Sequence, residues 1–381
     1  MTLTLLAAGV AGFWLVALFM MVTGFRQVKC LEDLPALAGD SPRVSLIVAA
    51  RDEAKHIEQA MQSLLAMSYP NLEVIAVNDR STDGTGDILD ALAHQDERLD
   101  VVHVHELPGG WLGKLNAMQA GFRQSTGELL LFADGDVYFH ADALSRAIRY
   151  LDDEKLDHLC SVPRLINTHW SMRMMLPVFS TFLFLKARPW KVQDPDSSAH
   201  MGVGAFNLVR RDCLEAIGGF EPIRLRPDDD LKLGKLVKQH GFRQGFVDAG
   251  RMLEVEWYHH AGEMIRGLEK NSFAVLEYSV LQTVAACLAA LITCVWPLAG
   301  LFGGGTAAQA LSGLSLAIMW LLGTEILRRQ EFGVHLGLLF PLGGGLIVVA
   351  MFNSMWQTLR QKGIRWRGTF YPLEQLRRNR L

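Results

Sequence analysis

Residues 3–25 form an apolar run without a single charged side chain. A helix of about 20 such residues spans the hydrocarbon core of a bilayer, so this run predicts a transmembrane helix. Further uncharged runs occupy 280–302, 305–324 and 333–356. We therefore expect a multi-pass membrane protein. Its expected membrane parts are an N-terminal helix at 1–25 and segments at 280–356.

Cations beside these segments predict their orientation. Arg26 and Lys29 follow the first run directly, and the tail at 357–381 is also basic. Cytoplasmic flanks are enriched in Lys and Arg, so we expect the large domain and the tail on the cytoplasmic side of the cell (inner) membrane. The tail stays there if the fourth run is a re-entrant or hairpin segment bent at Pro341-Leu-Gly-Gly-Gly345. The first run lacks the basic start and the cleavage site of a signal peptide.

Composition excludes some functions. The net charge is −3, which argues against a dedicated nucleic-acid binder. The five cysteines show neither metal-ligand nor disulfide spacing, which is typical of a reducing compartment. Charged residues are concentrated in the roughly 250 residues between the first and second apolar runs, a length sufficient for one large core.

Hydrophobic periodicity in this central region predicts a mostly parallel α/β sheet. Residues 43–50 (RVSLIVAA) form a short run that is apolar on both faces, as in a strand covered by helices. Strands and helices then alternate, which places helices on both faces of the sheet. Further strands are expected at 72–78, 100–104 and 128–133, and helices at 53–67, 84–95 and 113–124.

Acidic side chains follow three of these strands. Asp52 and Glu53 follow the first, Asp79 follows the second, and Asp134-Gly135-Asp136 follows the fourth. Each has a plain structural explanation when taken alone: Asp79 could close an Asx turn, and Asp83 could cap the next helix. Ligands bind outside the carboxyl ends of parallel strands, so three such clusters indicate a binding site.

Asp134 and Asp136 indicate what binds there. Two carboxylates this close repel each other unless a cation lies between them. They are hard oxygen ligands for Mg²⁺ or Mn²⁺, ions that commonly combine one or two carboxylates with substrate phosphates. A diphosphate substrate is therefore expected. The chain has no G-x-x-x-x-G-K-[ST] loop, which argues against a P-loop kinase.

Six motifs in order resemble those of membrane-anchored family 2 glycosyltransferases, which have the GT-A fold. This group includes ceramide glucosyltransferase-like and hopanoid- or carotenoid-associated enzymes. The resemblance covers about 40–275 and implies a Rossmann-like, mostly parallel α/β domain between the N- and C-terminal transmembrane helices. The motifs are VSLIVAARDEA, VNDRSTDGT, GWLGKLNAMQAG, ADGD, GAFNLVRRDCLEAIGGF and DDDLKLGKLVKQHG.

The resemblance also implies roles for individual residues. A carboxylate must take the proton of the acceptor hydroxyl in an inverting transfer, and a metal stabilises the departing nucleoside diphosphate. The acids at 228–230 should repel one another and raise at least one pKa, although acids at a helix start also favour the dipole. The implied roles are nucleotide-sugar binding for Asp52, Glu53, Asp79, Lys114 and Asp134, metal binding for Asp134 and Asp136, and catalysis for Asp230 as general base with Asp229 beside it.

Two departures from the family pattern affect the expected reaction. No Q-x-x-R-W motif follows the acidic segment, so we expect a single-sugar, non-processive hexosyltransferase. Glu256 stands where relatives often have arginine before the Trp-Tyr pair. His259 and His260 are adjacent on an expected loop, and adjacent histidines rarely converge on one metal ion, so a metal role for these two histidines is rejected. The residues that could contact the diphosphate instead are His259, His260, Arg266 and Lys270.

Residues 169–190 (HWSMRMMLPVFSTFLFLKARPW) have tryptophans and cations at both ends, as interfacial segments do, although a core helix or a crossing fits the same residues. We therefore expect a lipid acceptor and a nucleotide-sugar donor, with UDP assumed from the family. Two alternatives remain. One is a catalytically inactive nucleotide-sugar-binding membrane subunit, and the other is a nucleotidyltransferase on a similar sheet.

Overall fold

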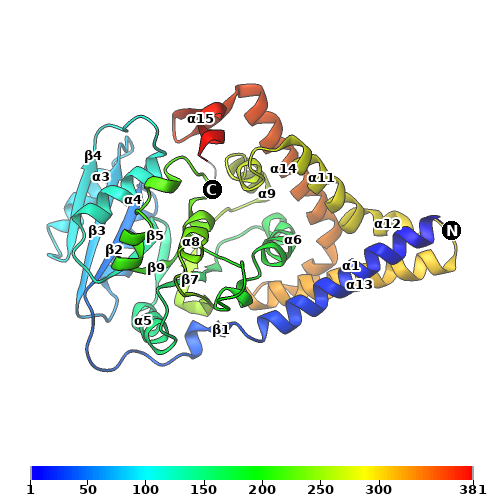
Figure 1. The fold of residues 1–381 in the computed structure, drawn as a ribbon, viewed down its shortest axis with the longest axis horizontal. Helices are drawn as coiled ribbons and strands as arrows, with labels where there is room; N and C mark the ends of the chain where they lie inside the picture. The colour runs from blue at the N-terminus through cyan, green and yellow to red at the C-terminus, as the bar shows by residue number, and fades with distance from the viewer. Residues whose placement is uncertain (1, 380–381) are drawn as a thin grey trace. The chain divides into compact units, whose positions relative to one another are not determined.

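The computed structural model describes residues 2–379, which form two compact units (Figure 1). Met1 and residues 380–381, at the ends of the expected N-terminal helix and basic tail, lie outside the described residues. We call the two parts the sheet unit and the helical unit. The sheet unit comprises 28–166, 188–257 and 378–379, and the helical unit comprises 2–27, 167–187 and 258–377.

The sheet unit is built on eight strands in the order β1-β10-β7-β9-β5-β2-β3-β4. Neighbouring strands are parallel except at β9, which is antiparallel to β5 and to β7. The mostly parallel α/β sheet expected from the sequence is therefore confirmed. The strands are β1 (Lys29–Cys30), β2 (Val44–Ala50), β3 (Leu72–Asp79), β4 (Leu99–Val104), β5 (Leu129–Asp134), β7 (His158–Val162), β9 (Asn207–Arg210) and β10 (Gln244–Asp248).

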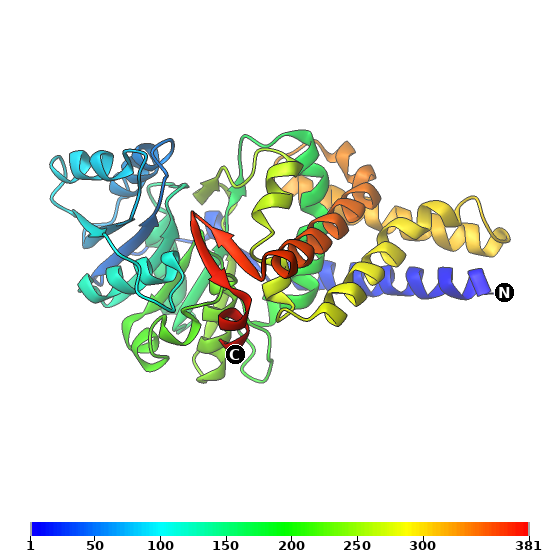
Figure 2. The same cartoon turned by 90° about the horizontal axis from the view of Figure 1, so that it is seen from above.

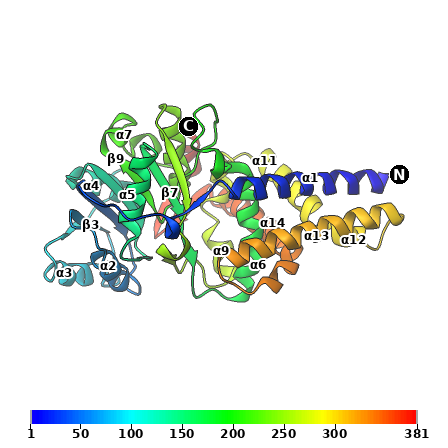
Figure 3. The ribbon, with the colours of Figure 1, turned by 90° about the horizontal axis from the view of Figure 1, so that it is seen from below.

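Helices cover both faces of this sheet. Helices α2 (Ile57–Leu65) and α3 (Thr85–Ala93) lie on one side of β3, and α4 (Gly113–Gln124) lies on the other (Figure 3). Strands β2, β3 and β5 are buried along nearly their whole length, which explains their continuous apolar runs. The remaining elements are α5 (Ala143–Asp153), α7 (Arg211–Ala216), α8 (Asp229–Gln239), and a small sheet of β6 (Val137–Phe139), β8 (Arg164–Leu165) and β11 (Leu253–Val255).

Glu73 ties the starts of the central strands together. Its carboxylate accepts hydrogen bonds from the Arg43 side chain (2.8 Å), the Thr126 backbone N–H (2.6 Å) and the Ser45 hydroxyl. Burial opposes ionisation, but the hydrogen bonds from Arg43, Ser45 and Thr126 outweigh it and lower the pKa of Glu73 to about 2. Glu73 is therefore a structural carboxylate rather than a candidate for catalysis.

This arrangement predicts a pH dependence of stability. Because the pKa of Glu73 is depressed on folding, its contribution is complete above the ordinary value of 4.5 and is lost as the pH falls towards about 2. The shift corresponds to about 3 kcal/mol. Urea denaturation of the wild type should show this loss, and Glu73→Gln should be less stable at pH 7 with a flatter profile below pH 4.5. Equal acid sensitivity of the two proteins would contradict the prediction.

The helical unit contains the apolar segments. Four of its helical segments are long and apolar enough to cross a membrane: Thr2–Phe25, Val280–Gly300, Thr306–Arg329 and Val334–Gln361. Helices α1 and α13 lie side by side and run in the same direction (Figures 1 and 3). Leu3, near the start of α1, approaches Gly304 just before α13, and Phe25, at the end of α1, contacts Arg329 at the end of α13. The elements of this unit are α1 (Thr2–Phe25), α6 (Trp170–Ala187), α9 (Ala261–Gly267), α10 (Ser272–Val275), α11 (Val280–Ala290), a π-helical turn (Leu291–Val295), α12 (Trp296–Gly300), α13 (Thr306–Arg329), a 3-10 helix (Val334–Leu339), α14 (Phe340–Gln361), hairpin β12–β13 (Gly363–Trp366 and Thr369–Pro372) and α15 (Leu373–Arg378). The hairpin follows α14 in Figure 2.

The fourth apolar segment corrects one expectation. We expected a bend at Pro341–Gly345, but α14 runs through these residues without a break. Proline is accommodated because it lies in the first turn, where its missing N–H has no helical partner. Gly343 and Gly344 are contact positions, since a Cβ there would collide with the Met174 carbonyl oxygen and with Cys294. The chain turns earlier, before Phe340, whose ring lies 5.4 Å from that of Trp14 in the middle of α1.

Helix α6 occupies most of the segment expected at the membrane interface, 169–190. About half of its residues are buried inside the helical unit, including Met172, Met175 and Val178. Trp170 at its start is 53% exposed. The helix thus serves as a packing element of the helical unit, and the interfacial role stays a prediction.

Candidate active site

Lys114 lies at the centre of the charged groups at the carboxyl edge of the sheet. It is the second residue of α4, and its Nζ is 2.7 Å from Oδ1 of Asp134 and 3.4 Å from Oδ2 of Asp229. Burial alone would lower the pKa of Lys114, but Asp134 and Asp229 raise it well above its usual range. The ammonium group therefore stays charged and joins the end of β5 to the first turn of α8.

Asp230 is held by two backbone amides. Leu231 N–H donates to its Oδ1 (2.8 Å), and Gly204 N–H donates to its Oδ2 (3.2 Å). Burial and the neighbouring charge of Asp229 raise the pKa of Asp230 to about 7, although Lys114 opposes the shift. This is the direction expected from like-charge repulsion in the acidic segment. A carboxyl group that titrates near neutral pH is suited to accept a proton and later release it.

Gly204 is the point at which these groups meet. A Cβ at this position would lie 2.7 Å from Oδ2 of Asp134 and 3.2 Å from Nζ of Lys114. A larger residue here would have to displace the Asp134 carboxylate, whereas glycine leaves the pair in place and its N–H reaches Asp230. The structure thus brings Asp134, Lys114, Asp229 and Asp230 together around one backbone position, although they come from distant parts of the sequence.

The neighbouring residues Asp136 and Glu53 extend the acidic cluster. Burial, followed by repulsion from Asp134 and Glu53, raises the pKa of Asp136 to about 7. Among residues 2–379, no group of three or more His, Cys, Asp or Glu side chains is arranged to hold a metal by itself. A metal at Asp134 and Asp136 would need further ligands, such as phosphate oxygens or water, and metal binding by this pair stays a prediction.

The crowding of Asp136 predicts opposite effects on stability and function. In metal-free buffer near pH 8, Asp136→Asn is expected to raise the free energy of unfolding by about 1 kcal/mol or more, because it removes a repelled, partly desolvated charge. Adding Mn²⁺ with a nucleotide sugar should then stabilise the wild type more than the variant. Thermal unfolding under both conditions tests this. A variant less stable than the wild type without metal would contradict it.

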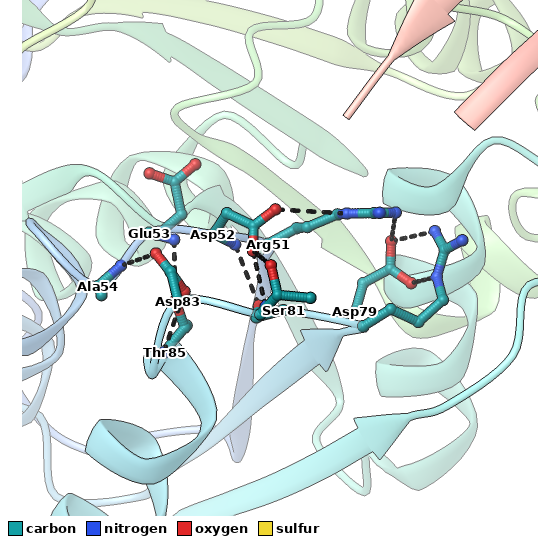
Figure 4. Close-up of polar contacts among 10 residues, drawn as sticks. Arg51, Asp52, Glu53, Ala54, Asp79, Ser81, Asp83 and Thr85 are labelled. Carbon is teal, nitrogen blue, oxygen red and sulfur yellow. Dashed lines mark hydrogen bonds and ion pairs between the residues drawn. The ribbon is translucent and has the colours of Figure 1, made fainter. Parts of the chain in front are cut away.

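Two loops are locked together where β2 and β3 end (Figure 4). Asp52 has a left-handed backbone (φ 54°), and its N–H donates to Ser81 Oγ (3.1 Å) while its carboxylate accepts from Thr82 N–H (2.8 Å). Glu53 N–H donates to Thr85 Oγ1 (2.9 Å). Because residues 52–54 bond to this loop, the helix expected at 53–67 begins only at Ile57.

Asp83 and Asp79 differ in how they are used. Asp83 accepts from Thr85 N–H and from Ala54 N–H, so it supports the start of α3, but the N-cap residue of that helix is Gly84 and not Asp83 as expected. Asp79 does not close an Asx turn. Its two oxygens accept from the Arg80 guanidinium (2.7 and 2.8 Å), and Arg51 lies 3.8 Å away. Asp79 and Asp52 therefore lie in the two neighbouring, charged loops at the ends of β3 and β2.

Three arginines belong to the site and were not identified from the sequence. Arg51 and Arg80 surround Asp79, and their only sequence signal was their position next to acidic strand ends. Arg226 is fully buried and forms a bidentate ion pair with Asp228 (2.8 Å for both contacts). Asp228 is thereby used as a structural group, and Asp229 and Asp230 are the acids that approach Lys114.

The expected diphosphate contacts lie in the helical unit. His259 Nδ1 is 2.7 Å from the Asn167 carbonyl oxygen, and His260 caps α9 by accepting from Glu263 N–H. Lys270 Nζ stacks 3.7 Å above the ring of Trp366. Arg266 lies in the last turn of α9. These contacts are structural, and a role for any of the four residues with a diphosphate stays a prediction.

Comparisons with known proteins agree with the earlier resemblance. Residues 45–218 match the family described as "Glycosyl transferase family 2". The chain is 26% identical to the "Probable glycosyltransferase YdaM" of Bacillus subtilis (strain 168), over 68% of this chain and 64% of that protein. It is 29% identical to the "Beta-monoglucosyldiacylglycerol synthase" of Synechocystis sp. (strain ATCC 27184 / PCC 6803 / Kazusa), over 62% and 50%. The chain thus spans less than two thirds of either relative.

A solved structure shares the fold. The "Mannosyltransferase PcManGT from Pyrobaculum calidifontis in complex with GDP-Man and Mn2+" aligns with 92% of this chain and 98% of its own length. The TM-score is 0.60 and the sequence identity is 20%. A likeness at this identity shows the architecture, which confirms the expected GT-A-like fold.

Proposed function

We propose, from the premise that residues 45–218 form a domain belonging to glycosyltransferase family 2, that this chain transfers one sugar from a nucleoside-diphosphate sugar to a lipid hydroxyl with inversion. The observation that carries the proposal is the convergence of Asp134, Lys114, Asp229 and Asp230 around Gly204. It combines a metal ligand, a fixed cation and a base with a raised pKa.

The residues have complementary roles in this proposal. Asp230 takes the proton of the acceptor hydroxyl while the hydroxyl oxygen attacks the anomeric carbon of the donor sugar. The Gly204 and Leu231 amides hold the Asp230 carboxylate in place. Lys114 balances the charges of Asp134 and Asp229. Asp134 and Asp136 would hold Mg²⁺ or Mn²⁺, and the bound ion would supply positive charge to the departing nucleoside diphosphate. Asp52, Glu53 and Asp79 line the part of the site that receives the nucleotide.

The substrates are proposed from several lines of support. The Synechocystis relative is named as a synthase of a glucosyl lipid, and four helical segments of this chain are apolar enough to cross a membrane. The structural neighbour was solved with GDP-Man and Mn²⁺, so a divalent metal is supported while the donor base stays open between UDP and GDP. The absence of a Q-x-x-R-W motif after the acidic segment supports a single transfer rather than a polymer.

We place the protein in the cell (inner) membrane with its sheet unit in the cytoplasm. Arg26 and Lys29 follow α1, and Arg328 and Arg329 end α13, which runs alongside it. Phe340, the first residue of α14, lies beside Trp14 in the middle of α1. The chain after α13 would thus go only part of the way across the membrane before α14 begins, which supports a re-entrant path that returns the chain to the same side. This topology keeps these cations and the basic residues after α14 on one side of the membrane.

The test uses the full chain in nanodiscs that contain diacylglycerol. UDP-glucose, UDP-galactose and GDP-mannose are supplied separately with Mn²⁺, and lipids and nucleotides are analysed by mass spectrometry. A glycosylated lipid together with free nucleoside diphosphate supports the proposal, and NMR of the product reports the anomer. Release of pyrophosphate would instead support a nucleotidyltransferase, and donor binding without turnover would support a binding subunit.

A further inference from the structure

Three fully or almost fully buried polar residues lie behind the active site and take no part in the mechanism above. His158, Asn207 and Gln244 are the first residues of β7, β9 and β10, and at most 2% of each is exposed. His158 lies directly opposite Gln244 in the parallel pair of β7 and β10. In the antiparallel pair of β7 and β9, His158 lies opposite Val209, and Asn207 is two residues before Val209. All three side chains therefore reach the same face of the sheet. We call them the buried triplet.

The side chains of the triplet are bonded to one another in a unique pattern. Gln244 Nε2 lies 2.9 Å from His158 Nδ1, and His158 Nε2 lies 3.1 Å from Asn207 Oδ1. Gln244 Oε1 accepts from Met201 N–H, so its amide orientation is determined and Nε2 must donate to Nδ1. His158 is therefore the neutral tautomer with its proton on Nε2, which agrees with a pKa that burial lowers to about 4.

Most of the remaining bonding capacity of the triplet holds one loop, and Gln244 Nε2 also donates to the Gly234 carbonyl oxygen of α8 (3.3 Å). Gln244 Oε1 accepts from Met201 N–H (2.8 Å). Asn207 accepts from Val203 N–H (3.2 Å) and donates to the Val203 carbonyl oxygen (2.6 Å). Residues 201–204 are thus held through their backbone from the side of the sheet. Gly204, at the end of this loop, donates to Asp230.

The same loop packs against α8 without any spare room. A Cβ at Gly202 would collide with the carbonyl oxygen of Asp230, and a Cβ at Gly234 would collide with the carbonyl oxygen of Met201. A shift of the loop would therefore move either the backbone or the carboxylate of Asp230. Displacing a catalytic group by about 1 Å costs on the order of 100-fold in rate.

We infer, on the basis of the transfer reaction proposed above, that His158, Asn207 and Gln244 are positioning residues: they hold the backbone of 201–204 so that Gly204 aims the base Asp230. The triplet acts through this loop and through one bond from Gln244 to Gly234 of α8, and it touches neither substrate nor metal in the proposed mechanism. Its neutral, fully paired hydrogen bonds give the loop one geometry, because any other arrangement leaves a buried polar atom without a partner.

The test compares two variants of one residue. Gln244→Met keeps the volume but removes the bonds to Met201, His158 and Gly234. It is expected to lower kcat for transfer by about 10- to 100-fold while the donor KM changes by less than about twofold. Gln244→Glu keeps an acceptor for Met201, and the O–H of its buried carboxyl in the neutral form can donate to His158 Nδ1, so it should retain more of kcat than Gln244→Met. Ser161→Ala is the matched control, because it removes a buried hydrogen bond between β7 and β10 away from the loop.

Hydrogen exchange supplies a readout that does not depend on turnover. In Gln244→Met, the amides of residues 201–204 should exchange faster than in the wild type, whereas those of β2 and β3 should not. If Gln244→Met does not fold, Asn207→Ser provides the same comparison, because it removes both bonds to Val203. Unchanged exchange in the loop, an unchanged kcat, or an equal fall in Ser161→Ala would overturn the inference. If the amides of residues 201–204 exchange faster in Gln244→Met than in the wild type, as expected, but the wild type transfers no sugar, the result would contradict the proposed function instead.

Discussion

Asp230→Asn is expected to lower kcat for sugar transfer by about 10³-fold while donor affinity changes little. The amide has nearly the same shape, and its single oxygen can keep one of the two hydrogen bonds that Gly204 and Leu231 donate to different oxygens of the aspartate. It cannot take a proton from the acceptor hydroxyl. Donor affinity measured by calorimetry with Mn²⁺, together with the single-turnover rate of transfer, separates the two effects.

The matched control is Asp212→Asn. Asp212 lies in the first turn of α7 and its carboxylate accepts a hydrogen bond from the next residue's N–H, as that of Asp230 does in α8. Its substitution should leave both rate and affinity unchanged. If Asp230→Asn retained more than about a tenth of the wild-type rate, Asp230 would not be the general base.

Asp134→Asn is expected to reduce transfer by about 10²- to 10³-fold and to increase the Mn²⁺ concentration needed for half-maximal activity. Asp134 is 39% exposed at its side chain, so it can reach a ligand while it is paired with Lys114. The variant loses one anionic oxygen ligand and leaves Lys114 with Asp229 as its remaining partner at 3.4 Å. Both changes weaken the grip on the diphosphate.

Metal titrations of Asp134→Asn and of Asp142→Asn should be compared. Asp142 has a similar exposure (41%) and also has a basic partner, Arg146, but it lies at the start of α5 away from the strand ends. Its substitution should not shift the metal dependence. An Asp134→Asn enzyme with wild-type activity at low Mn²⁺ would remove Asp134 from the metal site.

Local sequence pattern was sufficient for the strands that carry the site. The apolar runs at 44–50, 72–79 and 129–134 are buried on both faces, so a run of consecutive apolar residues is enough to predict their burial. The acids after them lie at one edge of the sheet because parallel strands all end on the same side. Repulsion within the two acidic segments was also predictable, because those residues are neighbours in the chain.

The sequence could not show which charge meets which. Asp228, Asp229 and Asp230 look equivalent in the printed chain, yet Arg226 pairs with the first, Lys114 approaches the second, and the Gly204 amide holds the third. These partners lie between 2 and 115 residues away, and their approach depends on how α4, α8 and the loop at 201–204 pack. The turn before α14 was likewise placed wrongly, because glycine and proline have local preferences that a neighbouring helix can override.

Sequence alone therefore determined the long apolar helices, the alternating α/β order and the acidic ends of the strands, since each depends on residues close together in the chain. Tertiary structure alone showed that Asp228 is a structural group paired with Arg226, whereas the resemblance had already indicated Asp230 as the base. It also revealed the buried triplet, whose members are separated by up to 86 residues. Such choices depend on long-range packing, which hides some polar groups from water and forces each one to find a partner.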